Sequence, residues 1–178
     1  MSDIDWSSVF ERDHAEQGAN ESEIRAMLET ALAPLSPEEV NEINAAHPKP
    51  WADPREWGIP NRPFPESYLS FLRWSNGGSF FNGERKFDEF FPADKIREYL
   101  LCYWIPMKMP GAVPFSFDGG GNFYLFDMRS EPSDGEFPIV FAPSTGMGWG
   151  EGHYHVVIAR SFLEACRGTT DPEVELWA

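Results

Sequence analysis

The hydrophobic period of the chain changes from helical to strand-like near residue 113, and this change constrains the fold more than any other feature. Upstream of that point, apolar residues recur at helical spacing in the stretches 21–33, 64–75 and 92–104. Downstream of it, strand-like spacing covers the stretches 113–117, 122–128, 137–142 and 153–159. Helices followed by a run of strands predict an α+β fold rather than alternating βαβ units.

Start and stop signals place the element boundaries. Ser36-Pro37-Glu38-Glu39 and Ser161-Phe162-Leu163-Glu164 are capping boxes, which predict helices to about residue 46 and to Gly168. Asn76-Gly77-Gly78 is typical of a helix C-cap, and Asn82-Gly83 indicates a hairpin between 79–81 and 86–91. We therefore expect a mainly antiparallel sheet of about four to six strands, with N-terminal helices and a C-terminal helix packed against it.

Two segments do not follow either period. Residues 47–63 contain five prolines together with Trp51 and Trp57, which predicts a loop pinned to the body by its tryptophans. Residues 1–20 show no clear period and predict an acidic tail or a loosely packed extension. The expected organisation is a single domain over 21–170, preceded by the extension 1–20 and followed by a C-terminal tail at 171–178.

The chain is strongly acidic, with 29 Asp and Glu against 14 Lys and Arg and a net charge of −15. Residues 1–45 hold eleven of the acids and only two arginines, Arg12 and Arg25. A field of this sign repels nucleic acid and anionic lipid and speeds encounter with a basic partner. Simple solubility is the competing explanation for the same charge.

Location is predicted by the signals that the sequence lacks. No run of roughly 18 uncharged apolar residues is present to span a bilayer, and residues 1–6 lack the basic and apolar regions of a signal peptide. Cys102 and Cys166 both fall in helix-like apolar stretches, which favours two buried thiols over a disulfide. We expect a cytoplasmic protein that neither enters a membrane nor binds nucleic acid.

Glu151, His153 and His155 are the candidate metal ligands. Alternate residues of a strand share a face, so these three could present two imidazoles and a carboxylate to zinc or iron. Gly150 and Gly152 instead indicate that Glu151 lies in a turn, and a solvated or hydrogen-bonded edge face is the alternative.

Other reactive arrangements are better explained by structure. Ser161 lacks the flanking glycines of a nucleophile elbow, and Glu164 explains it as a helix cap. Asp118 with the three glycines after it is typical of a turn between strands, because Tyr124 stands where a dinucleotide fingerprint needs a small residue. We therefore predict no catalytic residues and no cofactor.

Three stretches together resemble the SUKH superfamily, which groups bacterial immunity proteins with eukaryotic cell-wall regulators. They are a proline-led helix ending in Asn-Gly-Gly (65–78), a strand, glycine turn and strand ending in an acid (114–127), and a last strand running into a helix that starts Ser-Phe (157–164). The resemblance covers residues from about 60 to 168. Its family-like positions are Pro65, Asn76, Gly77, Gly78, Gly121, Ser161 and Phe162.

The resemblance implies an α+β domain without a catalytic centre that binds another protein. For the bacterial members this partner is a toxin, and an acidic chain is compatible with a basic toxin domain. The alternatives are a regulatory adaptor and a metal-dependent enzyme using Glu151, His153 and His155. The oligomeric state is not predicted.

The predicted partner-binding residues are Trp149, Glu151, Asp118 and Asp127, together with the acidic N-terminal segment. Trp149 lies between mobile glycines, as an aromatic contact residue would, although the pattern slightly favours the alternative of an indole folded back over the sheet. Capping and turn geometry explain Asp118 and Asp127 without a partner.

Overall fold

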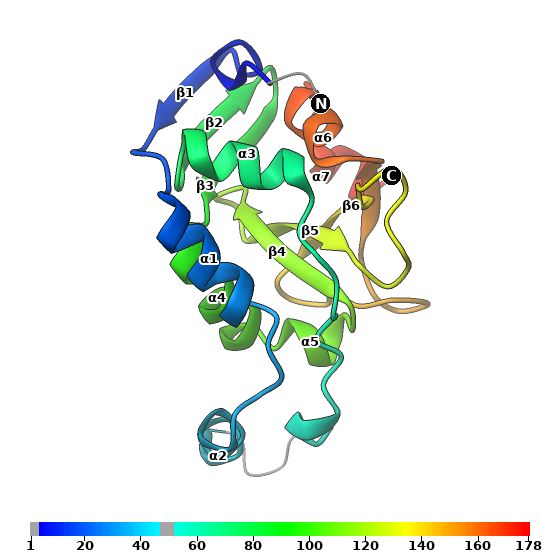
Figure 1. The fold of residues 1–178 in the computed structure, drawn as a ribbon. Coiled ribbons are helices and arrows are strands. Elements are labelled where there is room, and N and C mark those ends of the chain that lie inside the picture. The colour runs from blue at the N-terminus through cyan, green and yellow to red at the C-terminus, as the bar shows by residue number, and fades with distance from the viewer. Residues whose placement is uncertain (1–3, 47–51) are drawn as a thin grey trace.

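A computed structural model describes residues 4–46 and 52–178 (Figure 1). Within these residues, seven strands form one antiparallel sheet whose order follows the chain from β1 to β7. The strands are β1 (Arg12–Ala15), β2 (Gly78–Asn82), β3 (Arg85–Phe90), β4 (Ala112–Phe117), β5 (Asn122–Asp127), β6 (Ile139–Pro143) and β7 (Val156–Ala159). The predicted α+β class is confirmed, with more strands than the four to six expected.

Seven α-helices and three short 3-10 helices accompany the sheet in the described residues. The α-helices are α1 (Glu21–Thr30), α2 (Pro37–Ala46), α3 (Glu66–Trp74), α4 (Ile96–Cys102), α5 (Ile105–Lys108), α6 (Phe162–Arg167) and α7 (Pro172–Leu176). The 3-10 helices are η1 (Trp6–Ser8), η2 (Pro54–Glu56) and η3 (Ala93–Lys95). None of the described helices combines the length and apolar character that crossing a membrane requires.

Aromatic side chains fill the space between the sheet and its helices. On one face Phe71 of α3 lies 4.5 Å from Phe90 of β3, and Phe162 of α6 lies 5.3 Å from Phe115 of β4, measured between ring centroids. On the other face Tyr99 of α4 stacks 3.9 Å from Phe91. Helices therefore cover both faces of the sheet, which is where the abundant phenylalanines are buried.

Residues 4–20 form part of the folded body, whereas the sequence predicted a tail or a loose extension. Trp6 is 2% exposed and packs against Phe71 and Phe162. β1 pairs antiparallel with β2 at the edge of the sheet. All four residues of β1 have exposed side chains, so this strand is held by backbone pairing and carries no apolar period to recognise.

The C-terminal segment is also folded, where a tail was expected. Asp171 caps α7 by accepting a hydrogen bond from the Glu173 amide at 2.9 Å, and Pro172 occupies the first turn. α7 packs against β6 and β7. Asp-Pro-Glu is a recognisable helix start, so the sequence did carry this signal.

Several other local predictions change in detail. The C-cap of α3 is Ser75 in an extended conformation, and the positive φ angles fall later, at Gly77 (116°) and Gly78 (100°), where the chain turns into β2. Cys102 is exposed rather than buried, while Cys166 is buried, and both are free thiols. Trp57 is buried as predicted, whereas Trp51 lies outside the described residues.

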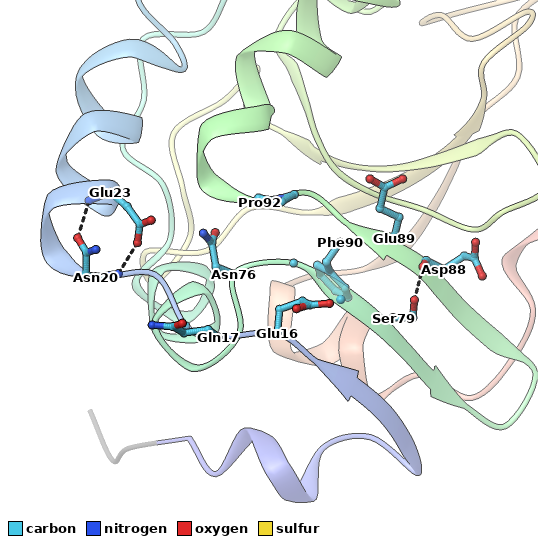
Figure 2. Close-up of a pocket in the computed structure, with 13 residues that line it drawn as sticks. Glu16, Gln17, Asn20, Glu23, Asn76, Ser79, Asp88, Glu89, Phe90 and Pro92 are labelled. Atoms are coloured by element: carbon cyan, nitrogen blue, oxygen red, sulfur yellow. Dashed lines mark hydrogen bonds between the residues drawn. The ribbon is translucent and has the colours of Figure 1, made fainter.

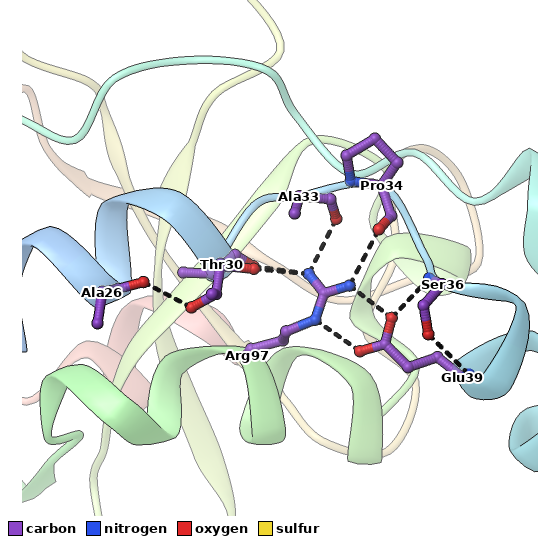
Figure 3. Close-up of polar contacts among 8 residues, drawn as sticks. Ala26, Thr30, Ala33, Pro34, Ser36, Glu39 and Arg97 are labelled. Atoms are coloured by element: carbon purple, nitrogen blue, oxygen red, sulfur yellow. Dashed lines mark hydrogen bonds and ion pairs between the residues drawn. The ribbon is translucent and has the colours of Figure 1, made fainter.

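Helix α2 is set apart from the sheet (Figure 1), and none of its residues is buried. It packs against η2 and is tied to α4 by Arg97, whose guanidinium binds both carboxylate oxygens of Glu39 at 2.7 Å. The same group donates to the carbonyls of Thr30 and Ala33 at 2.9 Å each (Figure 3). The planar guanidinium group of Arg97 thus caps the C-terminal end of α1 and also binds α2.

Arg97→Ala is expected to release α2 and lower the free energy of unfolding by about 2–3 kcal/mol, because the α1 carbonyls and Glu39 lose their charged donor. Hydrogen exchange should show lost amide protection across residues 38–46. Lys95→Ala is the control, because Lys95 makes only an exposed ion pair with Glu98 on the same helix turn. Unchanged protection of α2 in the Arg97 variant would contradict this role.

The same contact predicts a pH dependence. The hydrogen bond from Arg97 is the largest influence on Glu39 and holds the pKa of its carboxyl below the ordinary value of 4.5. A group whose pKa is lower in the folded state stabilises the fold fully at pH values above its unfolded-state pKa. This stabilisation is lost as the pH falls through the folded-state pKa. Protection of α2 should therefore decrease below about pH 4.5 in the native chain and show no such step in the Arg97→Ala variant.

Candidate protein-binding surface

A hollow on the surface is lined by acids from three segments that are distant in sequence. It has a volume of about 630 Å³ and lies between the link from β1 to α1, the turn before β2, and the end of β3 (Figure 2). Its charged lining residues are Glu16, Glu23, Asp88 and Glu89, with no Lys, Arg or His among the described residues that line it. We call this hollow the acidic groove.

Backbone and side-chain contacts fix the walls of the acidic groove. Glu23 accepts a hydrogen bond from the Asn20 amide at 2.8 Å in the capping box of α1, and Glu89 accepts one from the Tyr99 hydroxyl at 3.1 Å. Asn76 accepts a hydrogen bond from the Ala93 amide at 2.7 Å, which ties the turn before β2 to the end of β3. Burial and the Glu89 carboxylate together raise the pKa of Tyr99 to about 12, so its hydroxyl remains a donor at neutral pH.

A second hollow of about 320 Å³ shares Asp88 with the acidic groove. Its other charged lining residues are Glu84, Lys86, Asp118, Asp171 and Glu173. Tyr124 also lines it and donates its hydroxyl to the Lys86 carbonyl at 2.8 Å. We call the two hollows, which share Asp88 of β3, the acidic tract. Lys86 is the single cation among the described residues that line it.

This tract lies on an α+β scaffold that a family comparison identifies. The model of the SMI1 / KNR4 family (SUKH-1) matches residues 34–165, which is most of the chain. The chain belongs to the SMI1 / KNR4 family (SUKH-1). A comparison with curated proteins gave no match.

The SUKH-1 match places the acidic tract across the boundary of the family region. It begins at residue 34, earlier than the start near residue 60 that the resemblance predicted. Asp88, Glu89 and Asp118 lie within the match, whereas Glu16 and Glu23 precede it and Asp171 and Glu173 follow it. The segments that flank the SUKH-1 match therefore supply about half of the acids.

The family-like positions of this SUKH-1 chain serve the fold. Pro65 is the N-cap of α3, Gly121 has a φ of 98° in the β4–β5 turn, and Ser161 accepts a hydrogen bond from the Glu164 amide at 3.2 Å. Phe162 is fully buried. Asn76, Gly77 and Gly78 line the acidic groove, so this part of the family resemblance also touches the candidate surface.

Asp118 lines the acidic tract, but its carboxylate is engaged in the turn. It accepts hydrogen bonds from the amides of Gly120 and Asn122 and from the Asn122 side chain, at 2.6–2.9 Å. Asp127 lies at the other end of β5 and pairs with Arg129 at 2.8 Å. Burial raises the pKa of Asp127, yet the hydrogen bonds from Arg129 outweigh it and keep the pKa below its usual value. The fold therefore separates these two predicted residues.

Trp149 is folded back onto the protein. Its indole nitrogen donates to the Pro110 carbonyl at 2.9 Å, and the Arg129 guanidinium lies 3.6 Å from the ring centroid. The rings of His155 and Trp149 also form a T-shaped pair, with 4.9 Å between centroids. Of the two readings of Trp149, the structure shows the packed one, and a role for Trp149 in partner binding stays a prediction.

Glu151, His153 and His155 do not form the predicted strand face. β7 begins at Val156, so all three residues precede the strand, with Glu151 in a turn. Across the described parts of the chain, no three His, Cys, Asp or Glu side chains are grouped so that they could hold a metal ion. The expectation of alternate residues on a shared strand was wrong because the turn continues past Gly152, which has a positive φ of 81°.

Sequence reasoning missed most of the acidic tract. The excess of acids before residue 45 was visible and includes Glu16 and Glu23. The approach of these residues to Asp88 was not visible, because it depends on the pairing of β1 with β2. Asp171 and Glu173 were assigned to a tail, although they lie in and beside a capped helix.

Proposed function

We propose that this SUKH-1 protein is a non-enzymatic module that binds another protein, and that it acts as an immunity protein by covering a basic toxin domain. Membership of the family is consistent with an immunity or regulatory module. The observation that carries the proposal is the acidic tract, in which six of the eight acidic residues are exposed and Lys86 is the one cation in the described lining. A cytoplasmic location belongs to the same proposal.

The physical argument rests on charge and shape together. An open surface lined by carboxylates attracts cationic side chains and raises the association rate of a basic partner at low salt. The chain carries a net charge of −15, so the long-range field acts in the same direction as the local one. A domain that acts on nucleic acid is itself basic, because it must neutralise phosphates. Covering its cationic surface would block access to nucleic acid without any chemical step.

The test is to purify the protein encoded beside this chain's own gene and to measure its association with the full chain by stopped flow at several salt concentrations. We expect a 1:1 complex whose association rate falls by about tenfold or more between roughly 0.05 and 0.5 M salt. The paired variant Asp88→Asn with Glu89→Gln should slow association. Its matched control is Glu38→Gln with Glu42→Gln, which removes the same charge from exposed positions on α2.

The outcomes separate the alternatives. Equal slowing by both paired variants would mean that only net charge matters and would remove the acidic tract as the binding surface. A basic toxin-like neighbour that fails to bind would contradict the immunity role. Multiple turnovers of a small substrate by the purified chain would contradict the non-enzymatic proposal altogether.

A further inference from the structure

The exposed apolar side chains gather at the end of the molecule that carries β7 and α7. Five large apolar side chains are notably exposed in the described residues, and four of them belong to this region: Tyr154 (47%), Val157 (55%), Val174 (71%) and Trp177 (56%). α7 packs against β7, and the rings of Tyr154 and Trp177 lie 4.9 Å apart. We call these four residues the apolar patch. Clustered apolar exposure on a highly charged protein is a mark of an interaction site.

The apolar patch adjoins the acidic tract directly. Glu173 lines the second hollow and accepts a hydrogen bond from the Trp177 indole at 3.4 Å. Asp171, at the start of the same helix, lines that hollow as well. All charged residues from Asp171 to Trp177 are acids. An apolar centre therefore meets a rim of carboxylates, which is the usual anatomy of a protein interface.

β7 adds a second feature to the apolar patch. It is the last strand of the sheet, and within the described residues it pairs with β6 alone among the strands. Edge strands of folded proteins are usually protected by charge or by a covering element. The residues of β7 are Val156, Val157, Ile158 and Ala159, which carry no charge, so this edge strand lacks the charged side chains that usually protect one.

We propose that the apolar patch is the contact centre for the partner protein, and that it receives a Lys- or Arg-rich segment with apolar side chains between its cations. This inference rests on the proposed function and specifies the chemistry of the partner. The apolar side chains of the segment cover Trp177 and Val174, while its cations reach the acids of α7 and the second hollow. A second copy of this chain fits less well, because a two-fold contact would bring two acidic α7 helices and two chains of charge −15 together.

The experiment uses synthetic peptides as probes of the full chain, with binding measured by isothermal titration calorimetry. The first peptide alternates lysine with leucine, the second alternates lysine with serine, and the third alternates glutamate with leucine. We expect the lysine–leucine peptide to bind and the other two to bind at least about tenfold more weakly. Trp177→Ala and Val174→Ser should each reduce affinity for the first peptide, by about tenfold for Trp177→Ala.

The matched control is Leu28→Ser, because Leu28 is the remaining exposed large apolar residue, at 48%, and lies on α1. It should leave the affinity unchanged. The indole N–H signals in a nitrogen–proton NMR spectrum provide a second readout, in which the Trp177 signal is expected to shift most. Circular dichroism confirms that each variant remains folded.

Each other outcome has a definite meaning. Failure of the lysine–leucine peptide to bind, or unchanged affinity in both patch variants, overturns the inference. If Asp88→Asn with Glu89→Gln still slows the partner protein in that case, the proposed function stands without the patch. If the chain is a dimer that Trp177→Ala converts to a monomer, a second copy occupies the patch and the proposed occupant is wrong.

Discussion

Gly78→Ala is expected to lower the free energy of unfolding by more than about 3 kcal/mol. Gly78 has a φ of 100°, a conformation that costs an L-residue about 1–2 kcal/mol. A Cβ at this position would also lie 2.4 Å from the carbonyl oxygen of His14 in β1. Because that oxygen belongs to the backbone of the paired strand, the clash is relieved only by moving β1 away from β2.

The control for this prediction is Gly135→Ala. Gly135 has a comparable φ of 78°, and a Cβ built there meets nothing within 4 Å in the described residues. Its substitution should cost only the backbone strain, about 1–2 kcal/mol. Urea denaturation measures both variants, and hydrogen exchange across residues 11–16 reports whether β1 has detached. Equal destabilisation by the two substitutions would show that the close approach of β1 is unimportant.

Arg85→Ala is expected to destabilise the protein by about 3–4 kcal/mol. Arg85 is 3% exposed, and burial lowers its pKa. Its guanidinium donates to the Ala165 carbonyl at 2.9 Å, to the Thr170 carbonyl at 3.0 Å and to the Thr170 hydroxyl at 3.4 Å. Arg85 forms no salt bridge with a carboxylate in the described residues. The oxygens of Ala165 and Thr170, together with the C-terminal end of α6, therefore offset the cost of burying its charge.

The size of the effect follows from what the substitution leaves behind. Removing the guanidinium takes a charged donor from the carbonyls of Ala165 and Thr170 and opens a cavity beside Gly168, where an added Cβ would lie 1.9 Å from the Arg85 Nη1 atom. Arg85→Lys should recover only part of the loss, because an ammonium group lacks the planar fork. Arg167→Ala removes an exposed arginine from α6 and should leave stability nearly unchanged in the same urea titration. A loss in Arg85→Ala no larger than in Arg167→Ala would contradict the role of Arg85 in fixing the C-terminal helices.

The helices and the central strands were predictable because their signals are local. Ser36 and Glu39 form the predicted capping box, and Ser161 caps α6 as its spacing with Glu164 predicts. β4 and β5 were visible from their strand spacing and the glycine turn that joins them. Such signals depend on the backbone preferences and hydrogen bonds of residues within about four positions, so one sequence contains them in full.

The candidate surface was not predictable to the same degree, because its residues meet only through long-range pairing. β1 has no apolar period, so its place at the sheet edge, and with it the approach of Glu16 to Asp88, depends on backbone hydrogen bonds to β2. Arg85 is a charged residue beside a hairpin turn, and this local pattern predicts an exposed side chain. In the fold, α6 and the segment that follows α6 cover Arg85.

By itself the sequence determined an α+β chain, strongly acidic, with capped helices, a strand meander and the stretches that resemble SUKH proteins. The tertiary structure alone decided which acids share one surface, that Trp149 is packed against Arg129, and that Trp177 lies exposed beside Glu173. The physical reason is that turns and caps are set by neighbours along the chain. The surroundings of a side chain on the surface are set by strands and helices that pack from far away in sequence.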